Sequence, residues 1–176
     1  LIERNLHRAV ELMKNFKQVA ADQASEQRRR FELLAVVQEV MDTLRPSLRR
    51  YPHRVEIDVP PEIWMDSFPG ALGQVLINLI NNAYLHAFEG RTDGRVRIEA
   101  RVQGDEVHLR TVDNGVGMST ELLAQLFQPF FSTKIGRGGT GLGMTIVENL
   151  VKATLGGSVS VESRAGTGTR FNIRVP

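Results

Sequence analysis

The sequence has no cysteine among its 176 residues, which excludes disulfides and cysteine-based zinc or redox sites. It has no apolar run near the roughly 20 residues of a membrane span and no secretory signal at its start. Its net charge is only +2, which does not indicate a nucleic-acid surface. We therefore expect contact with neither membrane nor nucleic acid. Hydrophobic residues make up 41% of the sequence and charged residues 24%, a composition typical of a globular domain.

Residues 1–24 carry the period of an amphipathic helix. Their apolar residues alternate spacings of four and three, as in a coiled coil or helix bundle, at Ile2, Leu6, Ala9, Met13, Phe16 and Ala20. The polar residues 22–30 interrupt the period and predict a hinge. One such helix cannot bury its apolar face alone, so we expect helical partners outside the sequence. The chain starts without Met and inside the pattern, which we interpret as a cut from a longer protein.

Residues 31–176 alternate strand and helix patterns without regular β-α-β repeats. Apolar alternation predicts strands at 30–34, 54–60, 94–103, 106–113, 157–163 and 169–176. Helical spacing predicts helices at 33–48, 68–88, 120–127 and 140–154. Residues 114–140 form a long glycine- and proline-rich connection, which is typical of functional loops. The order of elements predicts an α+β fold, a two-layer sandwich of a mixed β-sheet and helices, preceded by one long N-terminal helix.

The glycine-rich stretch "KIGRGGTGLGM" contains the pattern G-x-G-x-x-G at Gly136, Gly138 and Gly141. A dinucleotide-binding fingerprint follows a buried strand, but Pro129 and the polar residues 132–134 precede this one and do not suit a central strand. The phosphate-binding pattern G-x-x-x-x-G-K-[ST] is absent. These glycines therefore indicate neither a dinucleotide site nor a P-loop, and another ligand or a plain flexible loop stays open.

Three further patterns lie elsewhere along the chain. In "NLINNA", Asn78 and Asn82 stand four apart on one face of a helix with apolar neighbours, and buried amides need hydrogen-bonding partners. In "DNGVG", Asp113 ends a strand, and Gly115 and Gly117 let the backbone approach a ligand closely. The last strand is preceded by "GTGT". Each alone fits a solvent-facing helix or a turn, but all four together indicate one polar site.

In this order the patterns resemble the ATP-binding region of sensor histidine kinases, in the superfamily that also holds DNA gyrase, mismatch-repair ATPases and a heat-shock chaperone. Five segments carry the resemblance: "QVLINLINNAYLHAF" (the N box), "VDNGVGM", "LFQPFFSTK", "GGTGLGMTIV" and "GTGTRF". The resemblance covers about residues 31–176 and implies a catalytic domain with the Bergerat ATP-binding fold. Residues 1–30 resemble the second helix of the dimerisation hairpin, truncated, followed by the hinge.

The resemblance implies ATP and Mg²⁺ as cofactors. Asp113 can accept a hydrogen bond from the exocyclic amine of adenine, where guanine presents an oxygen, and Asn82 matches the amide that binds Mg²⁺. Asn78, His86 and Lys134 are expected near the phosphates; a surface role is the alternative for His86 and Lys134. The remaining nucleotide-binding residues implied are Gly115, Gly117, Phe130, Gly139, Thr140, Gly141, Leu142, Gly143 and Thr169. For Phe130 the alternative is core packing, and for Thr169 it is the start of a strand.

The residue at position 78 bears on the reaction. In hydrolysing members of the superfamily a glutamate stands where Asn78 stands here, and an amide cannot take a proton from water. The resemblance therefore implies a kinase that transfers the ATP γ-phosphoryl group to a histidine, for relay to a response-regulator aspartate. Its expected partners are a receiver domain and its own dimerisation helices in a homodimeric parent. We expect a cytoplasmic location, which is compatible with a parent anchored in the inner membrane.

No segment matches the acceptor motif of the family, His-Glu/Asp-x-Arg/Asn-x-Pro. His7 is followed by arginine and lacks the proline, so we expect the acceptor outside the sequence and no appreciable autophosphorylation. Two alternatives stay open. One is an anti-sigma-type protein-serine kinase, against which the heptad pattern of residues 1–24 argues. The other is a nucleotide-binding pseudo-kinase scaffold, against which Asn82, Asp113 and the glycine segments argue.

Overall fold

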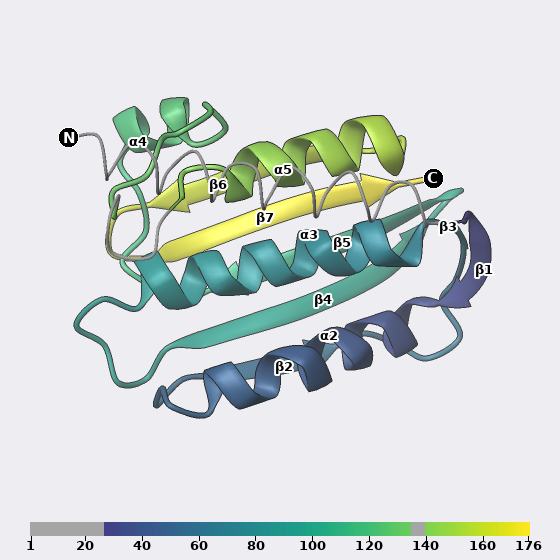
Figure 1. Cartoon of the computed structure of the whole chain (residues 1–176), viewed down its shortest axis with the longest axis horizontal. Helices are drawn as coiled ribbons and strands as arrows, with labels where there is room; N and C mark the ends of the chain where they lie inside the picture. Colours follow the sequence, from purple (N-terminus) through teal and green to yellow (C-terminus); the bar gives the residue numbers. More distant parts are fainter. Residues whose placement is uncertain (1–26, 135–139) are drawn as a thin grey trace, which may run out of the picture.

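The computed structural model describes residues 27–134 and 140–176. A single layer of helices covers one face of a mixed sheet (Figure 1). This arrangement confirms the predicted two-layer α+β sandwich. The expected helix of residues 1–24, together with His7 and Gly139, lies outside the described residues. No helix within the described ranges combines the length and apolarity needed to cross a membrane.

The main sheet has five strands in the order β2-β4-β5-β7-β6. Their bounds are Arg54–Asp58 (β2), Arg95–Gln103 (β4), Glu106–Asp113 (β5), Ser158–Arg164 (β6) and Gly168–Val175 (β7). Only β2 and β4 pair in parallel; the other neighbours are antiparallel. The register makes Asp113 of β5 the direct partner of Thr169 of β7. Two predicted site residues from distant parts of the chain are therefore adjacent.

A second sheet joins β1 (Arg29–Glu32) to β3 (Trp64–Ser67). The sequence patterns do not predict β3, because four residues are too few for an alternation to stand out. It forms because Phe31 and Met65 pair across the two strands and both side chains are buried. The predicted strand at 30–34 is correspondingly shorter, since the next helix begins at Leu33.

The helices are α2 (Leu33–Leu48), α3 (Pro69–Asn82), α4 (Thr120–Gln125) and α5 (Gly143–Asn149). Pro69 suits the first turn of α3 because it needs no backbone donor there. Both predicted long helices end in π-helical turns, at Ala83–Ala87 (η1) and Leu150–Thr154 (η2). The predicted start at 140 was wrong by three residues: α5 begins at Gly143.

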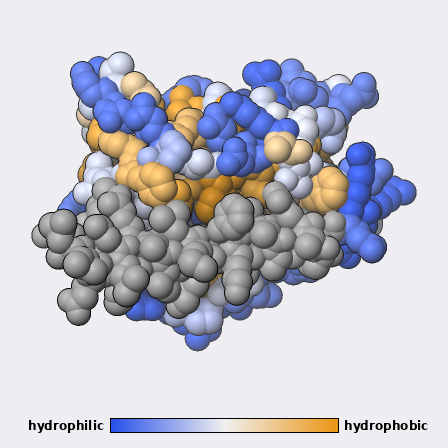
Figure 2. All heavy atoms as spheres, turned by 45° about the horizontal axis from the view of Figure 1, so that its top comes forward, coloured by the Kyte–Doolittle hydropathy of each residue, from blue (hydrophilic) through white to orange (hydrophobic). Residues whose placement is uncertain are grey.

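The core fills the space between the sheet and α2, α3 and α5. Its largest fully buried side chains are Leu33, Leu72, Leu76, Ile80, Ile98, Leu109 and Ile173. In the space-filling view, apolar residues gather across the middle of the face shown, with hydrophilic residues above them (Figure 2). At one edge of this core, the Val116 N–H donates to the Ala87 carbonyl at 2.9 Å. The loop after β5 is thereby attached to the end of the α3–η1 helix.

Candidate functional site

A cavity of about 560 Å³ opens where α3–η1, the loop after β5, α4 and the start of α5 meet. Its polar lining consists of Gln74, Asn78, Asn81, Asn82, His86, Glu89, Ser132, Thr133 and Thr140. Its apolar lining consists of Leu85, Val116, Met118, Leu122, Leu126, Phe131, Met144 and Ile146, with Gly117, Gly141 and Gly143 as bare backbone. Such a volume with a mixed apolar and polar lining suits a nucleotide-sized ligand.

Four side-chain amides of α3 line the cavity, and two of them, Asn78 and Asn82, were predicted. The Nδ2 of Asn78 is buried and has no hydrogen-bond partner among the described residues. A buried unpaired donor costs about 1–3 kcal/mol, so an acceptor supplied by a ligand or by water would stabilise this atom. Asn82 lines the same cavity one turn later. No group of three histidine or acidic side chains that could hold a metal occurs in the described ranges, so an ion here would take an amide oxygen together with ligand oxygens, as Mg²⁺ does.

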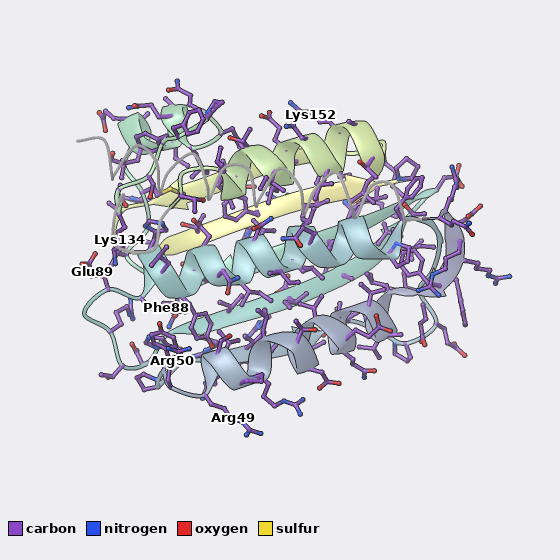
Figure 3. The ribbon with its side chains drawn as sticks, viewed as in Figure 1. Arg49, Arg50, Phe88, Glu89, Lys134 and Lys152 are labelled. Atoms are coloured by element: carbon purple, nitrogen blue, oxygen red, sulfur yellow. The ribbon has the colours of Figure 1, made fainter. Side chains whose placement is uncertain are left out.

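Side-chain contacts join the end of the α3–η1 helix to residues 132–134, which precede the glycine-rich loop. His86 Nδ1 lies 3.0 Å from Thr133 Oγ1. The Lys134 ammonium lies 3.4 Å from a Glu89 carboxylate oxygen, and its side chain is only 20% exposed. Figure 3 shows these two charged residues side by side at the end of the α3–η1 helix. Burial lowers the pKa of His86, as does the charge of Lys134, while Glu89 opposes the shift.

The lowered pKa of His86 predicts a loss of stability in acid. Below the ordinary histidine pKa of about 6.5, His86 is protonated in the unfolded chain but stays neutral in the folded chain until the pH reaches its lowered pKa. The free energy of unfolding should therefore decrease as the pH falls from 6.5 through the lowered folded pKa. Thermal unfolding between pH 8 and 5 would measure this decrease, which should be smaller in His86→Gln. Equal decreases in both proteins would contradict the prediction.

Asp113 ends β5 and is 9% exposed. Its Oδ1 accepts the N–H groups of Gly115 at 2.8 Å and of Thr169 at 3.2 Å. Burial raises the pKa of Asp113, and these two N–H donors oppose the rise. The other oxygen, Oδ2, accepts no hydrogen bond from the described residues, which leaves it as an acceptor for a ligand.

The glycines after Asp113 allow close packing of the loop. A Cβ on Gly115 would lie 2.4 Å from the Ala87 Cβ. Gly117 has a φ of +68°, and a Cβ there would lie 2.0 Å from the Arg164 carbonyl oxygen. The loop therefore fits between the end of η1 and the β6–β7 turn only without side chains at these positions. Of the two glycines, Gly117 also lines the cavity.

Phe130 and Gly141 pack together at the two ends of the glycine-rich segment. Phe130 has a φ of +64°, and a Cβ on Gly141 would lie 2.6 Å from the Phe130 carbonyl carbon. Phe130 does not line the cavity, whereas the neighbouring Phe131 does. The Leu142 N–H donates to Thr140 Oγ1 at 3.3 Å, just before α5 begins.

The structure brings seven of the predicted site residues around the cavity: Asn78, Asn82, His86, Gly117, Thr140, Gly141 and Gly143. Four others stand next to a lining residue in the sequence without lining the cavity: Gly115, Phe130, Lys134 and Leu142. Asp113 does not line it either; its Oδ1 accepts the N–H of Gly115, which precedes the lining residue Val116. Thr169 does not line the cavity; its N–H donates to Asp113 Oδ1. The prediction omitted Gln74 and Asn81, which lie four residues before and three after Asn78. That helical spacing of polar residues could have identified them.

Comparison with known proteins supplies the family. Residues 68–176 match the family described as histidine kinase-, DNA gyrase B-, and HSP90-like ATPase. The sensor histidine kinase RcsC of Escherichia coli is 35% identical over 128 residues, which are 69% of this chain and 12% of RcsC. The circadian input-output histidine kinase CikA of Synechococcus elongatus is 32% identical over 169 residues, 92% of this chain and 22% of CikA. The chain thus spans less than a quarter of either relative.

Among solved structures, the catalytic domain of histidine kinase ThkA has a TM-score of 0.74 at 26% identity, covering 85% of this chain and 95% of that domain. ThkA in complex with response regulator protein TrrA has a TM-score of 0.73 at 21% identity, covering 96% of this chain and 48% of that one. The match to the family extends over 109 of the 176 residues, from 68 to 176. Because this match covers more than half of the sequence, the chain belongs to the family of histidine kinase-, DNA gyrase B- and HSP90-like ATPases.

Proposed function

We propose that this chain is the ATP-binding catalytic part of a sensor histidine kinase, which transfers the ATP γ-phosphoryl group to a histidine on a dimerisation helix. One observation carries the proposal: the unpartnered buried amide of Asn78 lies in the same cavity as Asn82 and the bare backbone of Gly141 and Gly143. Amides and bare glycine backbone in one cavity, with Gly143 next to the Asn78 side chain, suit a phosphate chain with its metal ion.

The purine end of the site is formed by the loop after β5. Asp113 Oδ2 is available to accept the exocyclic amine of adenine, because Oδ1 already holds two backbone N–H groups. Gly117 presents backbone to the cavity without a side chain, so a flat base can lie against it. In our proposal Gly115 does not contact the base; it only allows the loop to pack on Ala87.

The phosphate end is formed by α3, η1 and the start of α5. Asn82 would hold Mg²⁺ through its side-chain oxygen, and the ion would supply positive charge to the phosphates. The backbone of Thr140, Gly141, Leu142 and Gly143, together with Gly139, would bind phosphate oxygens. His86 and Lys134 would add polar and positive groups near the γ-phosphate, and Phe130 would pack the base of the loop against Gly141.

Asn78 determines the reaction class in this proposal. Its amide cannot act as a general base toward water, which favours transfer to an acceptor that needs little activation, such as a neutral imidazole. The phosphoryl group would then pass to an aspartate of a response-regulator receiver domain, in keeping with the known complex of ThkA and TrrA. We further propose a homodimeric parent whose catalytic part works in the cytoplasm, where ATP and receiver domains occur.

Magnesium-dependent ATP binding tests this function. Calorimetric titration should give ATP binding that Mg²⁺ strengthens in the wild type, and Asn82→Ala should weaken the Mg²⁺-dependent part by about 10- to 100-fold, as expected for a contact to a charged group. Asn149→Ala is the matched control, because Asn149 is exposed on α5 outside the cavity. Absence of ATP binding in the wild type would overturn the proposal.

Labelling with γ-labelled ATP tests the kinase assignment in the same preparation. The chain alone should acquire no acid-labile label and should release phosphate slowly. An acid-labile label on His7 would contradict an acceptor outside the sequence. Rapid phosphate release would instead indicate an ATPase, against the argument from Asn78.

A further inference from the structure

The five-stranded sheet has helices on one face, and no described helix lies on its other, outer face (Figure 1). Strand alternation places eight arginines and no lysine on this outer face: Arg54, Arg95, Arg97, Arg101, Arg110, Arg164, Arg170 and Arg174. Five acidic residues share the face: Glu56, Asp58, Glu99, Glu106 and Glu162. The outer face therefore has an excess of three positive charges, whereas the whole sequence has a net charge of only +2.

Ion pairs neutralise part of this face. Four of its glutamates lie 3.1–3.7 Å from basic side chains: Glu56 beside Arg54, Arg95 and Arg97, Glu99 beside Arg97, Glu106 beside His108, and Glu162 beside Arg170. Four arginines form no ion pair with any described residue: Arg101, Arg110, Arg164 and Arg174. The unpaired positive charge of the outer face therefore lies on these four side chains.

Three of the four lie together around His108, and we call them the arginine cluster: Arg101, Arg110 and Arg174. His108 of β5 is the cross-strand partner of Arg101 on β4 and of Arg174 on β7. Arg110 follows two residues later on β5, so it is the diagonal neighbour of both. Strand spacings of about 4.8 Å and alternate residues about 6.8 Å apart give the cluster a span of roughly 10 by 7 Å. Like charges at such positions repel, and carboxylates placed among them would offset the repulsion.

The arginine cluster lies away from the nucleotide cavity. His108 precedes Asp113 by five residues on β5, about 17 Å along the strand, and the loop after Asp113 lines the cavity. The cavity is also on the helix side of the sheet, because α3, η1, α4 and α5 line it. In Figure 1, β4 ends beside β3, at the other end of the sheet from α4. A partner bound to the cluster would therefore leave the cavity open.

We propose that the arginine cluster is a docking surface for a protein partner that presents a group of surface carboxylates. Arginine binds a carboxylate through two parallel hydrogen bonds, which a lysine ammonium cannot do. Glu99 and Glu106 border the cluster, so a nucleic acid, whose phosphates repeat evenly, would bring some of them against like charge. A protein can place carboxylates opposite the arginines alone. This inference goes beyond the proposed function and does not depend on ATP binding.

The small size of the arginine cluster predicts weak and salt-sensitive binding. Stable protein interfaces bury about 1,600 Å² in total, far more than a patch of this span. Exposed charges are screened over about 10 Å at 0.1 M salt. We therefore expect the cluster to steer and orient an acidic partner, with an effect that is largest at low salt.

Titration with a fluorescein-labelled deca-glutamate peptide at low salt tests the docking surface by fluorescence anisotropy. The triple variant Arg101→Gln/Arg110→Gln/Arg174→Gln should bind the peptide about tenfold more weakly, as expected for the loss of three exposed ion pairs, and should keep its affinity for ATP. The matched control, Arg45→Gln/Arg49→Gln/Arg50→Gln, changes the net charge equally at the exposed end of α2, where Figure 3 shows Arg49 and Arg50. It should weaken the peptide by about twofold at most.

Equal losses in the two triple variants would show that only net charge matters and would overturn the inference. A wild type that does not bind the peptide overturns it too, as does tighter binding of a single-stranded DNA decamer than of the peptide. If the triple variant does not fold, Arg101→Gln and Arg174→Gln decide, each with an expected loss of about twofold; unchanged affinity in both contradicts the inference. Loss of ATP binding in the wild type would overturn the proposed function alone.

Discussion

Asp113→Asn should lose most of its affinity for ATP while remaining folded. The asparagine keeps an oxygen for the Gly115 and Thr169 N–H groups but replaces Oδ2 with an NH₂ group. That donor would face the amine of adenine, and the charged hydrogen bond would be lost. Together these changes cost about 2–4 kcal/mol, or roughly 30- to 1000-fold in the dissociation constant. Calorimetric titration with ATP measures the loss.

The stability of Asp113→Asn separates recognition from folding. Burial raises the pKa of Asp113, which means that the folded state disfavours its charge. A neutral amide removes that unfavourable term, so the midpoint of thermal unfolding at neutral pH should not decrease. Asp58→Asn, at an exposed position of β2, controls for the change of charge. Unchanged ATP affinity in Asp113→Asn would remove Asp113 from the proposed site.

Gly117→Ala should have the largest effect on stability. A Cβ at Gly117 would lie 2.0 Å from the Arg164 carbonyl oxygen, with the residue at a φ of +68°. The left-handed conformation costs about 1–2 kcal/mol for alanine. The overlap with the rigid backbone of the β6–β7 turn adds to this, because the loop must move off the turn. We expect the free energy of unfolding to decrease by more than about 3 kcal/mol and ATP binding to be lost.

Gly104→Ala is the matched control for this substitution. Gly104 has a φ of +63° in the β4–β5 turn, and a Cβ there would meet nothing within 4 Å. It should therefore lose only the conformational part, about 1–2 kcal/mol, and keep its ATP affinity. Denaturant unfolding of both variants gives the comparison. Equal losses would show that the contact between the loop and the turn contributes nothing to stability.

Much of the fold could be predicted from local patterns. The alternation in β4 and β5 around the Gly104–Asp105 turn predicted both strands, and the apolar spacing of α3 predicted its helix. These signals are local, because each side chain's burial follows from its position along one element. The strand at Trp64–Ser67 was missed, since it is held by a pairing with residues about 35 positions earlier in the chain. The boundary between residues 1–30 and 31–176 stays a prediction.

In the candidate site too, some residues could be predicted from local sequence patterns and others could not. Asn78, Asn82 and Asp113 were identified because polar groups at regular or strand-end positions contrast with apolar neighbours. Glu89 was not identified, because nothing near it in the sequence marks it. Its contact with Lys134 is one that only the folded chain creates. Thr169 was expected either to bind the nucleotide or to begin a strand; it lies at the start of β7, where its N–H donates to Asp113 Oδ1.

The sequence by itself determined the chemical groups of the site and the family to which the chain belongs, because residue identity and local spacing are properties of the chain alone. Only the tertiary structure decided which groups meet. A hydrogen bond needs atoms held within about 3 Å of each other, and the strand register of β5, β6 and β7 brings such atoms together from distant positions in the chain.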